Sequence, residues 1–64
     1  MLHKIEVYLR GGTNNGYVVQ VPMNAQQVEV DAEQYKRTND LAKVKCKGGL
    51  VESYRVYEVS DVHQ

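Results

Sequence analysis

The sequence predicts a mainly β protein: a small curved antiparallel sheet or a partly closed five-stranded barrel, with one short helix. Eleven valines and five tyrosines occur in a chain that has no Phe and no Trp, and β-branched and aromatic residues favour strands. Several stretches alternate between apolar and polar residues, which is typical of half-buried strands. Segments rich in Gly and Asn separate them, as expected for tight turns.

The first two expected strands are residues 3–10 and residues 16–22. Residues 3–10 alternate strictly, and their apolar face consists of Ile5, Val7 and Leu9. In residues 16–22 the expected inner face consists of Tyr17, Val19 and Val21. Pro22 has no N–H to donate, so we expect it to end this strand or to lie on a sheet edge.

A short third strand is expected over residues 26–31, with Val28 and Val30 facing inward. Asp31 then resembles a helix N-cap, and Glu33 follows in the first turn, where the helix dipole favours an acidic side chain. We therefore predict one short helix over about residues 32–39, between strands 3 and 4.

The last two expected strands flank Gly48-Gly49, a strong hairpin signal. Residues 41–47 place Ala42, Val44 and Cys46 on one face and lysines on the other. In residues 50–62 the alternation of apolar and polar residues changes phase, so that apolar residues fall on both faces of the expected strand. Either a β-bulge near Tyr57-Glu58 or burial of both faces, one of them by a second subunit, explains this slip.

The segment from Gly11 to Gly16 invites comparison with a phosphate-binding loop. The two glycines match the GxxxxG spacing, but Tyr17 and Val18 occupy the positions where Lys and Ser or Thr are required. A strand pattern follows, so the helix N-terminus that would hold a phosphate is missing. We interpret the segment as the turn of a β-hairpin, where Gly and Asn adopt left-handed conformations at low cost.

Length and composition limit the possible functions. The 64 residues form a single domain, residues 1–64, and a core this small is often reinforced by disulfides, a metal or a second subunit. Cys46 is the only cysteine, and His3 and His63 lie at opposite ends without zinc spacing. We therefore expect no metal and no cofactor, and we expect self-association into a dimer or a higher oligomer.

The net charge and the targeting patterns limit the classes of partner that we expect. The formal net charge is zero, which argues against a dedicated binder of duplex DNA. No apolar run approaches the roughly 20 residues of a membrane span, so we expect no membrane partner. A single cysteine and the lack of a signal-peptide pattern predict a cytoplasmic location.

The most suggestive pattern is the alternation of Lys43, Lys45 and Lys47. In a strand these side chains point the same way, about 7 Å apart, and the segment beyond the Gly48-Gly49 turn carries Tyr54 and Arg55. One interpretation is a cationic ridge that binds an anion. The other is a solvated strand face whose lysines discourage edge-to-edge pairing.

The tyrosines are the second group of candidates. Tyr8 belongs to the polar face of its strand, beside Arg10, where a ring is suited to stacking on a base or anchoring a protein contact. The alternative is that tyrosines fill the core in place of Phe and Trp, which we favour for Tyr17 and Tyr35. The candidate binding residues are Tyr8, Arg10, Lys43, Lys45, Lys47, Tyr54, Arg55 and Tyr57.

These patterns give catalysis little support, because no Ser, His and Asp fall in a recognisable spacing and Cys46 lies on an apolar face. We expect a non-enzymatic binding protein: a regulatory or inhibitory protein-interaction module that acts as a homo-oligomer, a role that suits mobile genetic elements among others. Its expected partners are a second copy and another protein. The alternative function is binding of a small anionic ligand, a nucleotide or single-stranded nucleic acid, through the lysine ridge and neighbouring tyrosines.

Overall fold

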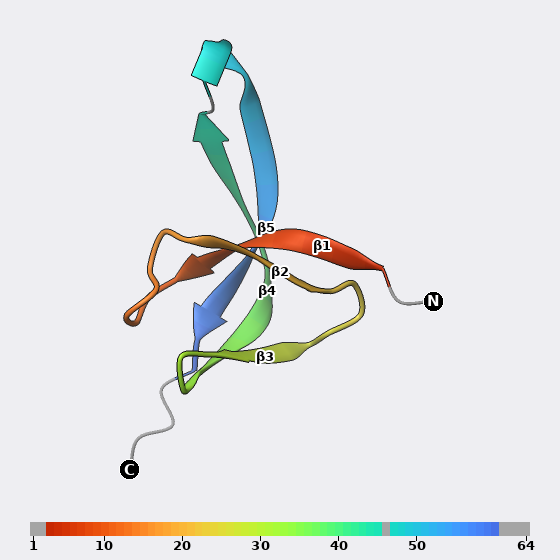
Figure 1. Ribbon diagram of the computed structural model, residues 1–64, viewed down its shortest axis with the longest axis vertical. Coiled ribbons are helices and arrows are strands. Elements are labelled where there is room, and N and C mark those ends of the chain that lie inside the picture. The colour runs from red at the N-terminus through yellow and green to blue at the C-terminus, as the bar shows by residue number, and fades with distance from the viewer. Residues whose placement is uncertain (1–2, 46, 61–64) are drawn as a thin grey trace.

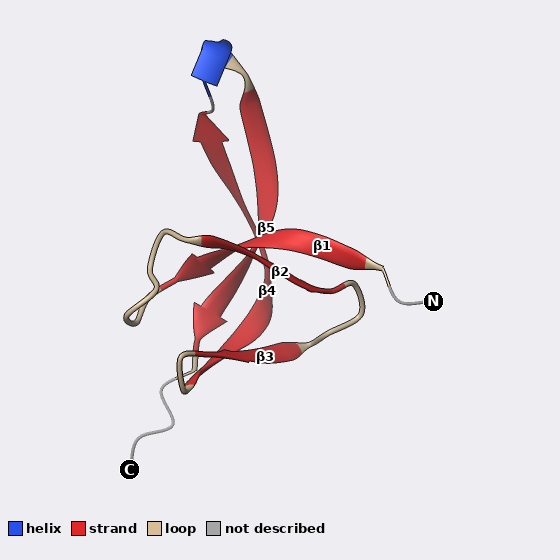
Figure 2. Cartoon of the chain, in the orientation of Figure 1, coloured by secondary structure: helices blue, strands red, loops and turns tan. Residues whose placement is uncertain are grey.

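The computed structural model describes residues 3–45 and 47–60. Its five strands form one sheet in the order β2-β1-β5-β4-β3, which coils into a nearly closed barrel (Figure 1). The strands are β1 (Lys4–Arg10), β2 (Val18–Pro22), β3 (Gln27–Val30), β4 (Glu33–Lys45) and β5 (Val51–Val59). Apart from one 3-10 turn, Lys47–Gly49, the described residues contain no helix (Figure 2). The predicted mainly β class and partly closed five-stranded barrel are therefore confirmed.

The sheet is mixed, and not antiparallel throughout as the sequence suggested. β1 pairs with β5 in parallel, from Val7 opposite Arg55 to Arg10 opposite Glu58. The other three pairings, β1 with β2, β3 with β4 and β4 with β5, are antiparallel. The parallel pair arises because the chain makes the β3–β4 hairpin before β5 returns to the free edge of β1, a long-range pairing that alternation within a strand does not encode.

The helix predicted over residues 32–39 is wrong, since these residues belong to the long strand β4. Val30 pairs with Glu33, and the turn between them consists of Asp31 and Ala32, with φ angles of 51° and 66°. Two successive left-handed residues are the geometry of a tight two-residue hairpin. Asp31 is favourable at such a turn as well as at a helix N-cap, and burial of Tyr35 in the sheet decides between the two.

The Asp31–Ala32 turn provides a stability test. Ala32 has a positive φ, which costs an L residue about 1–2 kcal/mol, whereas glycine adopts it freely. Ala32→Gly is expected to raise the free energy of unfolding by about 0.5–1 kcal/mol after the greater freedom of glycine in the unfolded chain is counted. Urea denaturation followed by circular dichroism measures it. Ala42→Gly, within strand β4, is the matched control and is expected to lower stability; a lower stability for both variants would contradict the assignment of strain to Ala32.

The core consists of inward residues from four strands, namely Val7, Leu9, Val21, Tyr35 and Tyr57. Val19, Val28 and Val30 pack against this cluster as expected from their alternation. Tyr17 does not: it precedes β2 and is 63% exposed. Its carbonyl accepts a hydrogen bond from the Leu9 amide at 2.9 Å, so its backbone closes the β1–β2 hairpin while its side chain projects outward.

An irregularity separates the barrel from a long hairpin formed by β4 and β5. Arg37 pairs with Tyr57 and Leu41 with Arg55, so three residues of β4 lie opposite Val56 alone. The bulge is therefore on β4, and not near Tyr57-Glu58, where one of the two alternative explanations placed it. The slip of the apolar period is real, because Val56 and Tyr57 are both buried, on opposite faces of β5.

Candidate functional site

The most prominent surface feature is the end of the β4–β5 hairpin, residues 41–55, which we call the arm. β5 pairs with β1 only from Arg55 onward, so before that residue it pairs with β4 alone and the arm is a two-stranded ribbon. Figure 1 shows the arm projecting from the barrel along the long axis of the molecule. The arm carries three large exposed apolar side chains: Leu41, Leu50 and Val51.

The two faces of the arm differ in chemistry, because directly paired residues of antiparallel strands share a face. One face contains the pairs Leu41 and Arg55, Lys43 and Ser53, and Lys45 and Val51; we call it the cationic face. The other contains the pairs Ala42 and Tyr54, and Val44 and Glu52. The Tyr54 hydroxyl donates to Glu52 at 3.2 Å, on the face opposite to the lysines.

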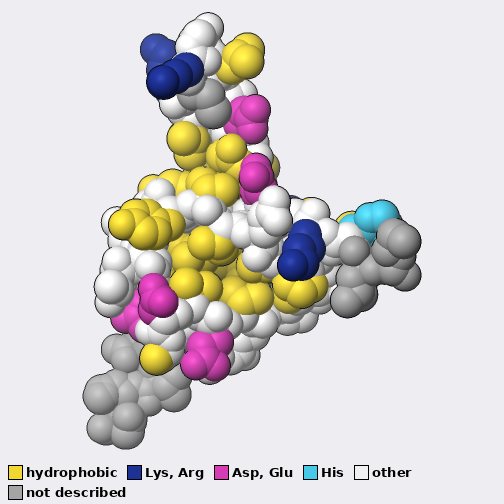
Figure 3. All heavy atoms as spheres, viewed as in Figure 1, with side chains coloured by type: hydrophobic (Ala, Val, Ile, Leu, Met, Phe, Trp, Pro, Cys, Tyr) yellow, Lys and Arg dark blue, Asp and Glu magenta, His cyan; other side chains and the backbone are white. Residues whose placement is uncertain are grey.

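The arm is positive and the rest of the chain is negative. Lys43, Lys45, Lys47 and Arg55 against Glu52 give the arm a formal charge of +3, which leaves −3 on the remainder of a neutral chain. Lys43 and Lys45 are exposed, and within residues 3–45 and 47–60 neither takes part in an ion pair. Figure 3 shows basic side chains at the far end of the arm.

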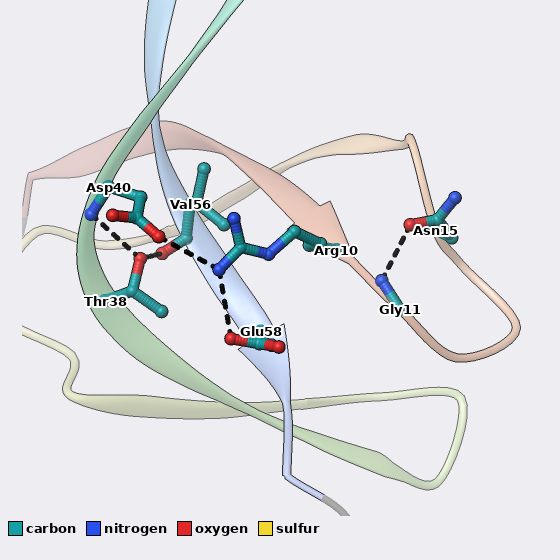
Figure 4. Close-up of polar contacts among 7 residues, drawn as sticks. All are labelled: Arg10, Gly11, Asn15, Thr38, Asp40, Val56 and Glu58. Atoms are coloured by element: carbon teal, nitrogen blue, oxygen red, sulfur yellow. Dashed lines mark hydrogen bonds and ion pairs between the residues drawn. The ribbon is translucent and has the colours of Figure 1, made fainter.

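Arg10 lies at the base of the arm and is neutralised there. One of its guanidinium nitrogens is 3.0 Å from Glu58 and 3.0 Å from Asp40 (Figure 4). The hydrogen bonds that Arg10 donates to Glu58 and then to Asp40 raise the pKa of Arg10 above its usual value. This candidate cation is therefore occupied in fixing the bulge of β4 against β1 and β5.

The bulge itself is held by Thr38. Its hydroxyl donates to the Val56 carbonyl at 2.7 Å and accepts from the Asp40 amide at 3.1 Å (Figure 4). These bonds replace the ladder bonds that the extra residues of β4 disrupt. No local pattern predicts the Arg10 contacts, because Asp40 and Glu58 are 30 and 48 residues away along the chain.

The tyrosine candidates lie in three different environments. Tyr57 is fully buried in the core and its hydroxyl donates to the Ala25 carbonyl, so it is not available to a partner. Tyr8 is half-buried and pairs with Val18 and Val56. Tyr54 is half-buried on the arm face opposite the lysines. The structure therefore brings Lys43, Lys45 and Arg55 together but does not place a candidate tyrosine beside them.

The segment from Gly11 to Gly16 is the turn of the β1–β2 hairpin, as predicted. The Gly16 amide donates to the Leu9 carbonyl at 2.8 Å, and the Gly11 amide donates to the Asn15 side chain at 2.7 Å. The Thr13 amide donates to the Glu33 carboxylate at 2.8 Å. These amides are used within the protein, and an acidic group occupies one of them, which argues against a phosphate at this loop.

Glu33 ties this loop to the core and makes stability depend on pH. The Thr13 amide and then the Tyr35 hydroxyl lower the pKa of Glu33, so its contribution is present above the pKa of the unfolded chain and is lost as the pH falls through the folded value. The free energy of unfolding is therefore expected to decrease on acidification below about pH 5. Urea denaturation at a series of pH values measures this.

The control for this dependence is Glu33→Gln, which keeps an acceptor oxygen but removes the ionisable group. Its free energy of unfolding is expected to vary less with pH than that of the unmodified protein. Glu29→Gln, on the exposed face of β3, is expected to preserve the original dependence. An unchanged slope in Glu33→Gln would show that other carboxylates cause the acid sensitivity.

Other kinds of site have no support in the part of the chain that the structure describes. Residues 3–45 and 47–60 contain no group of three His, Cys, Asp or Glu side chains placed to hold a metal ion. None of their helical segments is long and apolar enough to cross a membrane. Cys46, expected to be buried, lies outside the described residues.

Comparison with protein-family models, with curated proteins and with solved structures finds no match for this chain. The fold and the arm define a small mainly β protein with a projecting hairpin.

Proposed function

We propose that this protein is a non-enzymatic, cytoplasmic binding protein that acts as a homo-oligomer and uses the arm as its contact surface. The observation that carries the proposal is the exposure of Leu41, Leu50 and Val51, at 59%, 65% and 58%. Large apolar side chains gathered on one exposed feature mark interaction sites more often than isolated ones do. A narrow ribbon also cannot cover these side chains by itself, because each strand has only one neighbour.

This architecture suits a regulatory or inhibitory role. The barrel is a rigid base, and the bonds of Arg10 and Thr38 hold the root of the arm in a fixed direction. A pre-organised projection loses little conformational freedom when it binds, so more of the contact energy remains as affinity. The first partner to test is a second copy of the chain.

The test is the oligomeric state at micromolar concentration, measured by sedimentation equilibrium. The unmodified protein is expected to be at least a dimer, and a triple variant with Leu41→Ser, Leu50→Ser and Val51→Ser is expected to be a monomer, since apolar anchors dominate interface energies. The matched control carries Tyr17→Ser and Met23→Ser, which remove exposed apolar side chains from the barrel. A monomeric unmodified protein would contradict the proposal.

A second candidate function is binding of a small anionic ligand, a nucleotide or single-stranded nucleic acid. The observation in its favour is that the paired residues of the cationic face include Lys43, Lys45 and Arg55 and no carboxylate. Titration with ATP and with a short oligothymidine tests it. Binding should weaken with added salt and disappear in a variant with Lys43→Gln, Lys45→Gln and Lys47→Gln; no binding to either probe by the unmodified protein would exclude it.

A further inference from the structure

The two ends of the molecule carry opposite charge. The tip of the arm and the β3–β4 turn lie at opposite ends of the long axis (Figure 1), whose extent is 43 Å. The turn end of the β3–β4 hairpin contains Glu29, Asp31 and Glu33, and the basic residue of this pairing is Lys36, opposite Gln27 at the far end from the turn. Figure 3 shows acidic side chains at this lower end of the barrel and basic ones at the arm tip. The molecule is therefore polarised along its length.

The placement of the apolar residues restricts what can cover the arm. Leu41 and Val51 lie on the cationic face, between and beside the basic residues. If two arms met through this face, Lys43, Lys45 and Arg55 of each copy would be brought together, and like-charge contacts of this kind cost several kcal/mol. A surface that carries carboxylates is therefore favoured over a second cationic face as the cover of Leu41 and Val51.

We propose that a second copy supplies this acidic surface, so that the cationic face of each arm rests on the β3–β4 hairpin of the other copy in an antiparallel dimer. This inference rests on the homo-oligomer proposed above and names its interface. A two-fold axis makes the contact occur twice, arm on hairpin and hairpin on arm, and closes the assembly. Each arm, of formal charge +3, then meets the exposed carboxylates of Glu29 and Asp31 on the other copy.

The charges that this contact needs are available. Glu29 and Asp31 are exposed, and in residues 3–45 and 47–60 neither is engaged in an ion pair, as is also true of Lys43 and Lys45. Glu33 does not contribute to this contact, because its carboxylate already accepts hydrogen bonds from Thr13 and Tyr35. An antiparallel arrangement also opposes the two molecular dipoles, which lowers the electrostatic energy of the pair relative to a parallel one.

The experiment reverses the charge on each side separately and measures the dimer dissociation constant by sedimentation equilibrium. The arm variant carries Lys43→Glu and Lys45→Glu. The hairpin variant carries Glu29→Lys and Asp31→Asn; asparagine is chosen because it tolerates the left-handed φ of Asp31. Each variant alone is expected to dimerise about tenfold or more weakly than the unmodified protein, and an equimolar mixture is expected to recover dimers.

Control variants change charge of the same sign elsewhere on the barrel. Lys4→Glu controls the arm variant and Glu6→Lys controls the hairpin variant. Both positions lie on β1, outside the β3–β4 hairpin, and both variants are expected to dimerise within about twofold of the unmodified protein, as for charges outside the contact. Circular dichroism confirms that each variant is folded before its dissociation constant is compared.

The outcomes separate this inference from the proposed function. If the hairpin variant dimerises as tightly as the unmodified protein, the arm does not rest on the β3–β4 hairpin, although the homo-oligomer stands. If the arm variant alone is weakened and the mixture recovers nothing, the acidic surface lies elsewhere and the inference is overturned. If the unmodified protein is a monomer, the homo-oligomer itself is wrong.

Discussion

Replacing Tyr57 with alanine is expected to lower the free energy of unfolding by about 3–5 kcal/mol, the usual cost of truncating a buried aromatic side chain. Tyr57 is fully buried, and its ring belongs to the cluster formed with Val7, Leu9, Val21 and Tyr35. The free energy of unfolding of a folded protein is about 0.05–0.15 kcal/mol per residue, so a chain of this length is stabilised by only about 3–10 kcal/mol in total. The variant is therefore expected to be largely unfolded in moderate urea, where circular dichroism still detects the native sheet of the unmodified protein.

Tyr57→Phe separates the ring from the hydroxyl. It keeps the buried ring and removes only the hydrogen bond to the Ala25 carbonyl, which connects β5 to the loop between β2 and β3. The expected loss is about 1 kcal/mol, typical of one hydrogen bond. All measurements are made at one protein concentration, because oligomerisation shifts apparent stability. A loss below 1 kcal/mol for Tyr57→Ala would contradict the role of Tyr57 as a central core residue.

Local patterns predicted the strands but not their partners. The alternation of residues 3–10 predicted β1 because every second side chain of a strand meets the same face. The same rule placed Lys43 and Lys45 together on one face of the arm. Pairing depends on residues far apart in the chain, so the parallel contact of β1 with β5 had no local signal.

The wrong helix has a specific cause. Asp31 favours both a helix N-cap and a tight turn, since in each its short side chain can accept a backbone hydrogen bond. The apolar residues of the following segment are too few to fix its period, and burial of Tyr35 against Leu9 and Tyr57 selects the strand. The neutralised state of Arg10 was equally hidden, because Asp40 and Glu58 approach it only after β4 bulges and β5 returns.

Gly11→Ala is expected to lower the free energy of unfolding by about 2–3 kcal/mol, the combined cost of a left-handed backbone and an overpacked contact. Gly11 has a φ of 90°, and a Cβ added there would lie 2.7 Å from Cγ1 of Val59. Its carbonyl is also 3.0 Å from the Tyr35 hydroxyl, so the backbone cannot shift without disturbing the Tyr35 and Glu33 contacts that join the loop to the core.

Gly48→Ala is the matched control for this clash. Gly48 has a φ of 85°, and a Cβ there would meet nothing within 4 Å, so the variant carries the backbone strain without the contact. Its expected loss is about 1 kcal/mol or less, because alanine also restricts the unfolded chain. The difference between the two variants, measured by urea denaturation, gives the cost of the contact with Val59. Equal losses would mean that the Val59 side chain moves aside and that φ alone sets the requirement for glycine at Gly11.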